Sequence, residues 1–176
     1  MGRPVRHAGG DRPLNLRLAT PGDIPVLPDI ERSAGQAFRG GEQDWIADDQ
    51  VTPAEAYPAL VAAERVWVGE VDGAVRGFVQ IEVLDHDLHI WELAVALDWQ
   101  KRGLGRTLMA QALDIGRRRG CAAATLTTFR NIAWNAPFYR GLGFEILEAP
   151  SARLAAILAS EAGRGLTDRC AMASKL

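Results

Sequence analysis

The chain is poor in cysteine. Its 176 residues include only Cys121 and Cys170, and these two lie far apart in the sequence. That number and spacing exclude the closely paired cysteines of a zinc site. We therefore expect no metal centre, and we interpret both cysteines as small buried hydrophobic residues rather than as ligands, a disulfide or a nucleophile.

Long apolar runs are also missing. No stretch approaches the length of a membrane span, and residues 1–12 are polar and glycine-rich, without the hydrophobic centre of a signal peptide. These features argue against a membrane partner and predict a cytoplasmic protein. We expect residues 1–12 to form a disordered N-terminal tail.

The chain carries little net charge. The formal net charge is −2, the pI is near 5.9, and no basic tract is interleaved with aromatic residues. The basic run Arg117–Arg119 is most simply a solvated helix end, where positive charge is favoured by the helix dipole. The sequence therefore argues against nucleic acid as a partner.

The length favours one hydrophobic core. Of the 176 residues, 48% are hydrophobic and 24% are charged, which is enough for one well-buried core and too little for two ordinary domains. Neither a repeat nor a domain linker interrupts the sequence. We expect a single domain over residues 13–176.

Periodicity and turn residues predict alternating helices and strands. Strands are expected at 14–18, 66–71, 75–84, 88–96, 122–127, 144–147 and 170–173. Helices are expected at 23–38, with Asp23 as N-cap and Pro28 splitting or tightening the helix, and at 54–64, 103–119 and 151–162. Residues 39–53 are predicted to form a loop.

The order of these elements predicts a mixed sheet. Asp72-Gly73 and the short polar turn 85–87 suit consecutive antiparallel hairpins. The helix 103–119 and the strand after it instead form a crossover unit, which requires a parallel pair. We expect an α/β (α+β) fold with a mixed, largely antiparallel central sheet of about six or seven strands flanked by helices.

A glycine-rich turn precedes the helix 103–119. It consists of Gln100, Lys101, Arg102, Gly103, Leu104, Gly105 and Arg106. A strand that ends at such a turn, with a helix directly behind it, directs backbone N–H groups and the positive end of the helix at one point. The glycines allow close approach, and the basic side chains add charge. The turn therefore predicts a pyrophosphate site. It is not a nucleotide-hydrolase phosphate loop, because Arg106-Thr107 stands where Lys-Ser or Lys-Thr is needed.

A second segment, from Phe129 to Phe144, strengthens this interpretation. The turn matches Gln/Arg-x-x-Gly-x-Gly/Ala, and the segment ends in Tyr-x-x-x-Gly-Phe, beginning at Tyr139. In these two motifs, their order and their separation, the chain resembles the GCN5-related N-acetyltransferase (GNAT) superfamily, from about Leu14 to Leu147. The resemblance implies a GNAT-like acyl-CoA N-acyltransferase fold and acetyl-CoA as co-substrate.

The resemblance also implies roles for individual residues. The backbone of Leu93, Ala94 and Val95 would pair with the pantetheine arm, and one of its N–H groups would serve the oxyanion. Tyr139 would be the general acid that protonates the departing thiolate. Asn131 and Asn135 are both candidates to contact the coenzyme. Many family members have asparagine seven residues before the tyrosine, where this chain has Ile132, so the choice between the two stays open.

The general base has two candidates. Period-two alternation places His89, Trp91 and Leu93 on one face of the strand and Ile90, Glu92 and Ala94 on the other, unless a bulge intervenes. His89 lies six residues before Val95, where several family members carry a catalytic carboxylate or histidine, and the ordinary pKa of histidine suits proton abstraction near neutrality. Glu92 is the rival, and a water relay is a third route.

The acceptor is the least defined part of the reaction. The loop from Glu42 to Asp49 gathers acidic groups around Trp45, which would suit a cationic amine, although a solvated polar loop is the simpler explanation. The acceptor is expected to be a small-molecule amine or a protein amine, and homodimer formation is left open.

Two functions fit the sequence. The first is an acetyl-CoA-dependent N-acetyltransferase in which the amine attacks directly, because neither cysteine lies in a motif and no nucleophile is available for a covalent enzyme intermediate. The second is a non-catalytic acyl-CoA-binding sensor or docking module. Tyr139 with a base opposite it favours the enzyme, since a binding module needs neither.

Overall fold

The computed structural model describes residues 13–176, so the expected tail at 1–12 lies outside the described residues. The chain divides into two compact units. The first unit contains the residues up to Ile81 together with Glu92–Ala112, and the second contains Glu82–Trp91 and Leu113–Leu176. The expectation of a single domain stays a prediction.

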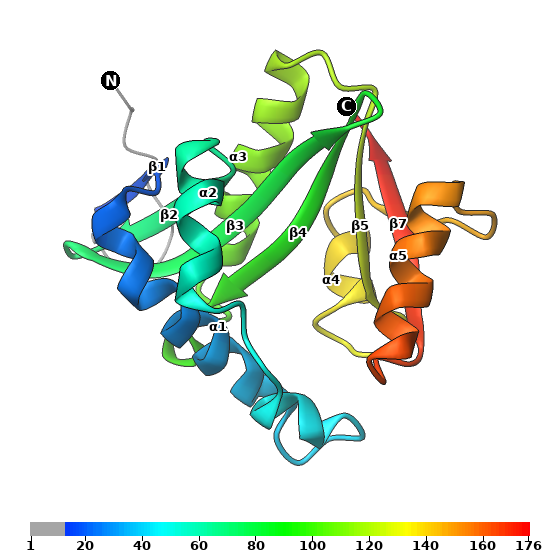
Figure 1. Cartoon of the computed structure of the whole chain (residues 1–176), viewed down its shortest axis with the longest axis horizontal. Coiled ribbons are helices and arrows are strands. Elements are labelled where there is room, and N and C mark those ends of the chain that lie inside the picture. Colours follow the sequence, from blue (N-terminus) through cyan, green and yellow to red (C-terminus); the bar gives the residue numbers. More distant parts are fainter. Residues whose placement is uncertain (1–12) are drawn as a thin grey trace. The chain divides into compact units, whose positions relative to one another are not determined.

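Within residues 13–176, seven strands form the sheet, in the order β1-β2-β3-β4-β5-β7-β6 (Figure 1). They are β1 (Leu14–Leu18), β2 (Val66–Val71), β3 (Ala74–Leu84), β4 (Asp87–Val95), β5 (Ala123–Phe129), β6 (Glu145–Ile146) and β7 (Arg169–Lys175). The β4–β5 pair is parallel, whereas β1–β2, β2–β3, β5–β7 and β6–β7 are antiparallel. The predicted mixed, largely antiparallel sheet is confirmed.

Two tight turns connect β2 to β3 and β3 to β4. Asp72 and Gly73 have φ values of 52° and 75°, and Asp85 and His86 have φ values of 50° and 68°. Positive φ at both central residues is the pattern of a type I′ turn, whose twist matches that of the flanking strands. Both hairpins that the sequence predicts are therefore present.

The helices agree with the sequence prediction in place but differ in detail. They are α1 (Leu27–Gly35), α2 (Tyr57–Ala62), α3 (Leu104–Arg118), α4 (Ala136–Arg140) and α5 (Ala152–Gly163). The helix predicted over 23–38 is a 3-10 turn at Pro21–Val26, then α1, then a 3-10 turn at Gln36–Phe38, and the loop 39–53 contains a 3-10 turn at Asp44–Asp48. Pro25 and Pro28 lack an N–H, so one regular helix cannot run through both. The predicted 54–64 helix likewise begins as a 3-10 turn, at Ala54–Ala56.

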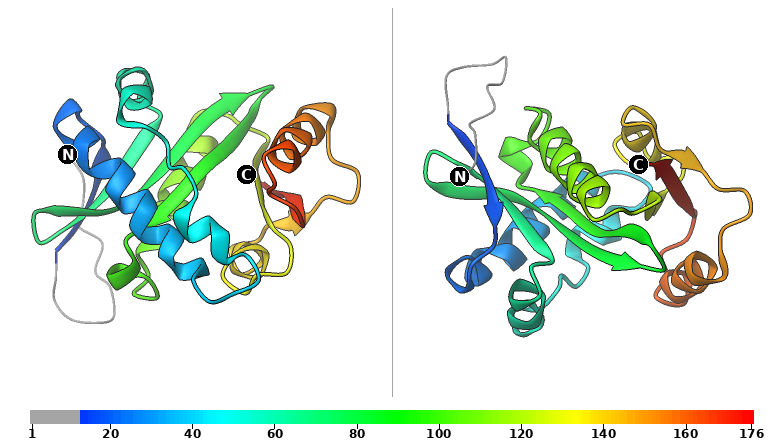
Figure 2. Two further views of the ribbon diagram at one scale, coloured as in Figure 1. Left: turned by 60° about the horizontal axis from the view of Figure 1, so that its bottom comes forward. Right: turned by 90° about the horizontal axis from the view of Figure 1, so that it is seen from above.

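In the first unit, helices cover both faces of the strands (Figure 2). Leu27 of α1 and Tyr57 of α2 pack with Phe78 of β3 in one hydrophobic cluster. On the other face, Gly77 of β3 lets α3 approach, because a Cβ there would lie 3.2 Å from a methyl carbon of Leu108 and 2.8 Å from a backbone oxygen of β4. This packing places the end of β4 beside the start of α3.

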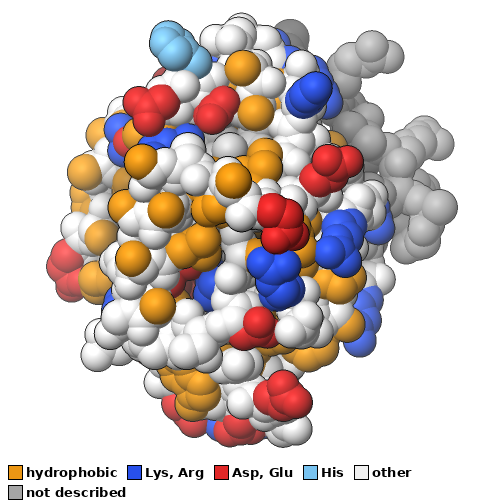
Figure 3. All heavy atoms as spheres, turned by 90° about the vertical axis from the view of Figure 1, so that its right-hand side faces the viewer, with side chains coloured by type: hydrophobic (Ala, Val, Ile, Leu, Met, Phe, Trp, Pro, Cys, Tyr) orange, Lys and Arg blue, Asp and Glu red, His pale blue; other side chains and the backbone are white. Residues whose placement is uncertain are grey.

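In the second unit, α5 packs against β5 and β7 through a buried polar cluster. Glu161 of α5 accepts a hydrogen bond of 2.7 Å from the Thr127 hydroxyl and forms a 2.8 Å ion pair with Arg169. The Arg169 guanidinium also lies over the Phe129 ring, 4.8 Å from its centre. The outward face of α5 carries small apolar side chains, which Figure 3 shows in orange; they are Ala152, Ala155, Ala156, Ala159 and Ala162.

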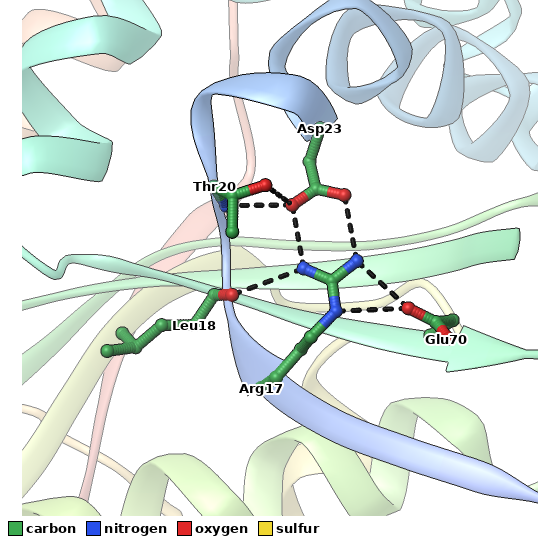
Figure 4. Close-up of polar contacts among 5 residues, drawn as sticks. All are labelled: Arg17, Leu18, Thr20, Asp23 and Glu70. Carbon is green, nitrogen blue, oxygen red and sulfur yellow. Dashed lines mark hydrogen bonds and ion pairs between the residues drawn. The ribbon is translucent and has the colours of Figure 1, made fainter. Parts of the chain in front are cut away.

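Arg17 of β1 organises the start of the first unit (Figure 4). Its guanidinium donates to both carboxylate oxygens of Asp23, at 2.7 and 2.9 Å, and to Glu70 of β2 at 3.0 Å. Asp23 in turn accepts hydrogen bonds from the backbone N–H and the hydroxyl of Thr20. The arginine therefore ties β1, β2 and the first helical turn together.

Asp23 is not the N-cap that the sequence predicts. Thr20 occupies that position, and Asp23 lies three residues later and reaches back to the Thr20 N–H. The helical turn therefore starts earlier than expected, at Pro21, which needs no N–H partner there. The Arg17 guanidinium is the main reason why the pKa of the Asp23 carboxyl lies well below its ordinary value of 3.8.

Both cysteines are buried and free, as predicted. Burial raises the pKa of the Cys121 thiol and of the Cys170 thiol, so both stay protonated near neutral pH. Within residues 13–176, no helix is long and apolar enough to cross a membrane.

The Asp23 carboxylate should contribute strongly to stability at neutral pH. Asp23→Asn is expected to lower the free energy of unfolding by about 2 kcal/mol at pH 7, because the partly buried Arg17 guanidinium loses its charged acceptor. A depressed folded-state pKa stabilises the fold above the ordinary carboxyl pKa, and this contribution disappears as the pH falls. Urea unfolding should therefore show the difference between wild type and variant shrinking between pH 5 and pH 2.

A matched exposed pair provides the control. Asp114 pairs with Arg118 on the exposed side of α3. Asp114→Asn should change the free energy of unfolding by less than about 0.5 kcal/mol. Equal losses in Asp23→Asn and Asp114→Asn would contradict the assignment.

Candidate active site

The turn between β4 and α3 has the backbone geometry of an anion site. A 3-10 turn at Leu97–Trp99 follows β4, and then Lys101 and Gly103 take positive φ values of 59° and 91°. The Gly103 carbonyl accepts both the backbone N–H of Thr107, at 3.1 Å, and its hydroxyl, at 3.2 Å, so Gly103 caps α3. The N–H groups in the first turn of a helix have no intrahelical acceptor and can bind an anion.

Gln100 braces this turn. Its side-chain amide donates to the Val95 carbonyl at 3.0 Å and to the Ala34 carbonyl at 3.5 Å. Leu97 adds a second tie to α1, because its N–H donates to the Ser33 hydroxyl at 3.0 Å. The sequence interpretation placed Gln100 among the coenzyme-binding residues. The structure gives its side chain another task, which is to fix the turn against β4 and α1.

Positive charge lies around the turn. The Arg102 guanidinium lies 5.0 Å from the centre of the Trp99 ring, and Arg76 of β3 lies 5.3 Å from the same ring. Cation–π contacts of this kind restrict the long arginine side chains. Lys101, Arg102 and Arg106 are all exposed on this turn.

The end of β4 lies beyond its ladder with β5. The parallel ladder joins Leu88–Ile90 to Ala124–Leu126, and the last paired residue of β4 is Ile90. Leu93–Val95, which the family resemblance assigns to the pantetheine arm, follow this last pair. Their place in the chain therefore agrees with that assignment, which stays a prediction.

The structure distinguishes the two candidate asparagines. Asn135 precedes α4, and its side-chain oxygen accepts a 2.8 Å hydrogen bond from the Thr128 hydroxyl of β5. Its amide NH₂ group can still donate to another acceptor. Asn131 is exposed and donates to Asp168 at 2.9 Å. Contact of either asparagine with the coenzyme stays a prediction.

Tyr139 lies on α4 in a fixed orientation. Its ring makes edge contacts with Phe138 and Phe144, at centroid distances of 5.1 and 6.0 Å. Its carbonyl accepts the backbone N–H of Phe144 at 3.1 Å, which closes the end of the Tyr-x-x-x-Gly-Phe motif. The side chain is half-buried, which suits a phenol that must be held in place and still reach a substrate.

His89 does not have the environment expected of a base that titrates near neutrality. Its side chain is 1% exposed, and its Nδ1 lies 2.9 Å from the Thr125 hydroxyl. Burial, with a smaller contribution from the positive charge of Arg153, lowers the pKa of His89 to about 4. The near-neutral pKa on which the sequence interpretation relied is therefore wrong.

The side-chain alternation of β4 is interrupted. Leu88 packs beside Gly116 of α3, and Val95 packs beside Gly77, where Leu108 of α3 also lies. Residues seven apart in an unbroken strand point to opposite faces. Because both residues lie toward α3, one residue of β4 departs from the alternation, as in a bulge. The single alternation proposed for the whole strand does not hold, and the bulge that the sequence left open is supported.

Glu92 lies near a buried tyrosine on the opposite side from α3. Its negative charge contributes to a raised pKa of the Tyr57 phenol, although burial is the largest cause and Glu31 also contributes. The Tyr57 hydroxyl donates to Glu31 of α1 at 3.2 Å, and Glu31 also accepts the N–H of Thr52. Glu31 therefore contacts the phenol, and the charge of Glu92 acts on it from another part of the chain.

Two of the four carboxylates in the acidic loop pair with a neighbouring arginine. Arg39 forms ion pairs with Asp44 at 3.2 Å and with Asp48 at 2.6 Å. Trp45 is 40% exposed, and its indole N–H donates to Gln43. One arginine balances one of the four negative charges, and a role of this loop in acceptor binding stays a prediction.

A known family accounts for these features. A model of the acetyltransferase (GNAT) family matches residues 28–144, which is more than half of the chain and includes both motifs. This chain belongs to the acetyltransferase (GNAT) family. Among the described residues, no group of three histidine, cysteine, aspartate or glutamate side chains could hold a metal ion.

Solved structures of GNAT enzymes share the fold at low identity. PaiA N-acetyltransferase from Thermoplasma acidophilum, in complex with coenzyme A, is 15% identical with a TM-score of 0.71, and the match covers 93% of this chain and 99% of that one. The ribosomal-protein-S18-alanine N-acetyltransferase from Escherichia coli is 20% identical with a TM-score of 0.67, covering 92% and 93%. N-acetylglutamate synthase from Neisseria gonorrhoeae, complexed with coenzyme A and N-acetyl-glutamate, is 19% identical with a TM-score of 0.67; the match covers 93% of this chain and 35% of that longer one.

The site residues of this GNAT chain divide between the two units. The first unit holds Glu92, Leu93–Val95 and the turn from Gln100 to Arg106, and the second holds His89, Asn131, Asn135 and Tyr139. Sequence reasoning missed Glu31 and Tyr57, which are 26 residues apart, and Thr125, which is 36 residues from His89. No local pattern marks these partners, because only the fold brings them together.

The conformation of Gly103 should matter for coenzyme binding. An alanine at a φ of 91° costs about 1–3 kcal/mol, and the turn must shift to relieve that strain. We expect Gly103→Ala to weaken the affinity for coenzyme A about tenfold or more in calorimetry. Gly73→Ala is the matched control, because Gly73 also has a positive φ but lies in the β2–β3 hairpin. Unchanged affinity in Gly103→Ala would contradict the assignment.

Proposed function

We propose that this GNAT chain transfers an acetyl group from acetyl-CoA to a primary amine by direct attack. The observation that carries the proposal is the turn before α3, where Gly103 caps the helix and Lys101, Arg102 and Arg106 are exposed. The chain also belongs to a family of acetyltransferases. Structures with the same fold hold coenzyme A, which supports the choice of coenzyme.

The turn and Asn135 would hold the coenzyme. The first-turn N–H groups of α3 would bind the pyrophosphate, and Lys101, Arg102 and Arg106 would balance its charge. The Asn135 amide, fixed by Thr128, would donate a further hydrogen bond. The backbone of Leu93–Val95 would receive the pantetheine arm and direct one N–H toward the developing oxyanion.

Glu92 is our candidate for the general base. The acceptor loses a proton to the Glu92 carboxylate, and its nitrogen then attacks the thioester carbonyl. When the tetrahedral intermediate collapses, the carbon–sulfur bond breaks and the Tyr139 phenol donates a proton to the leaving thiolate. The products are an N-acetyl amine and coenzyme A.

Direct attack is supported by the state of the cysteines. A covalent acetyl-enzyme would need an accessible thiolate, but both thiols are buried and burial raises their pKa. The acceptor is a small-molecule amine or a protein amine. Enzymes with this fold are named for both kinds, a ribosomal-protein alanine and glutamate.

An amine panel tests the proposed function. Thiol release from acetyl-CoA should accelerate in the presence of one class among polyamines, amino acids, and peptides with free N-termini or lysines, and mass spectrometry should find the N-acetyl product. Binding of coenzyme A without turnover of any amine would instead identify a binding module. Failure to bind coenzyme A would refute both functions.

Tyr139 should matter for the chemical step more than for binding. Tyr139→Phe is expected to lower kcat by about 100-fold, because the leaving thiolate loses its proton donor. The affinity for coenzyme A, measured by calorimetry on the same variant, should change little. Full turnover by Tyr139→Phe would assign the proton to water or to another side chain.

Glu92 should be required for deprotonation of the acceptor. Glu92→Gln preserves the shape of the side chain but removes the base, so kcat should fall by about 100-fold. Glu55→Gln provides a comparison, because Glu55 is an exposed carboxylate at the start of the segment before α2. If both variants keep the wild-type kcat, Glu92 is not the base.

A further inference from the structure

We propose that His89 is a positioning residue, which fixes the register of the β4–β5 ladder and the orientation of Trp91, and that it is not the base. The kinetic part of this inference rests on the proposed function. Its structural part concerns the second unit alone and can be tested without an acceptor.

The first argument is the place of His89 in the ladder. The parallel ladder of β4 and β5 has three residue pairs, and His89 with Thr125 is the middle one. The two side chains are joined by the 2.9 Å contact between Nδ1 and the hydroxyl, and they are only 1% and 3% exposed. A buried side-chain bond across so short a ladder helps to set the register of the two strands.

The second argument is the contact with Trp91. The imidazole meets the indole edge to face, with ring centres 4.4 Å apart and planes at 77°. The indole N–H donates to Glu82 of β3 at 2.9 Å. Trp91 is 40% exposed and is therefore an aromatic surface held at two points, one of which is His89.

The third argument is the distribution of charge around the imidazole. Arg153 of α5 is the cation whose charge acts on His89. The nearby carboxylates are engaged by that arginine, Asp85 of the β3–β4 turn at 3.2 Å and Asp87 of β4 at 3.4 Å. Thr125 on β5 is a neutral partner. These surroundings favour a neutral imidazole, which can bond the hydroxyl through one tautomer.

These observations explain how His89 can affect the reaction without taking a proton from the acceptor. A side chain that is 1% exposed cannot meet an acceptor amine directly. Its effect on the reaction must pass through the structures that it holds, which are the β4–β5 ladder and the Trp91 ring. Small displacements of this kind reduce turnover because the reacting groups lose their alignment.

Histidine NMR tests the structural part. In the full-length ¹⁵N-histidine-labelled protein, with the His89 signal assigned by its loss in His89→Asn, we expect one neutral tautomer from pH 5 to pH 9. The exposed His86 provides the internal comparison. A His89 signal that titrates near the ordinary value of 6.5 would overturn the proposal, whether or not any amine is acetylated.

Paired variants test the kinetic part. His89→Ala removes the bond to Thr125 and should lower kcat about tenfold or more. His89→Asn offers an amide near the position of Nδ1, so it should recover most of that rate and keep the wild-type pH profile. A base role predicts equal losses in both variants and a changed pH profile, and that result would overturn the proposal.

Variants of the partner provide an independent measurement if the His89 variants fold poorly. Thr125→Ser keeps the hydroxyl and should retain the wild-type rate, whereas Thr125→Val removes it and should reproduce the loss seen in His89→Ala. Equal rates in Thr125→Val and the wild type would show that the hydrogen bond positions nothing, and would also overturn the proposal.

Discussion

The N-terminus of α3 is the constraint on which the rest of the candidate site depends. A helix cannot satisfy its first N–H groups internally, so they need a cap, water or a ligand. Here the Gly103 carbonyl accepts a hydrogen bond from the Thr107 hydroxyl. Gln100 and Leu97 donate hydrogen bonds that connect the preceding turn to β4 and α1. The turn is therefore held in place by the protein, and so are the first-turn N–H groups of α3.

Several arginine side chains of this protein form ion pairs with carboxylates. Arg17, Arg39 and Arg169 each hold carboxylates from other segments, and these pairs stabilise the entry to α1, the loop before α2 and the packing of α5. The acidic loop was attractive as an acceptor site from its composition alone. In the structure, Arg39 pairs with two of its four carboxylates, and Glu31 and Glu92 are further acidic groups, whose charges act on Tyr57.

Burial separates the two candidate bases. The ordinary pKa of histidine is the more suitable one for proton abstraction near neutrality. Burial destabilises the charged imidazolium, however, and so does the positive charge of a neighbouring arginine. His89 is buried beside Arg153 in this way, so we assign it a structural role through its contacts rather than a role as a base. Glu92 differs from His89 in burial, because its side chain is only partly buried.

The sequence by itself determined the order of the elements, both hairpin turns, the mixed sheet and the two motifs that identify the family. These features depend on local periodicity, glycine and proline, which act within a few residues. Only the tertiary structure showed the contacts of individual side chains: Gln100 with the Val95 carbonyl, Asn135 with Thr128, Asn131 with Asp168, Asp23 with Arg17, and His89 buried against Thr125. Burial, charge pairing and the register of β4 arise from segments far apart in the chain, so no local pattern encodes them.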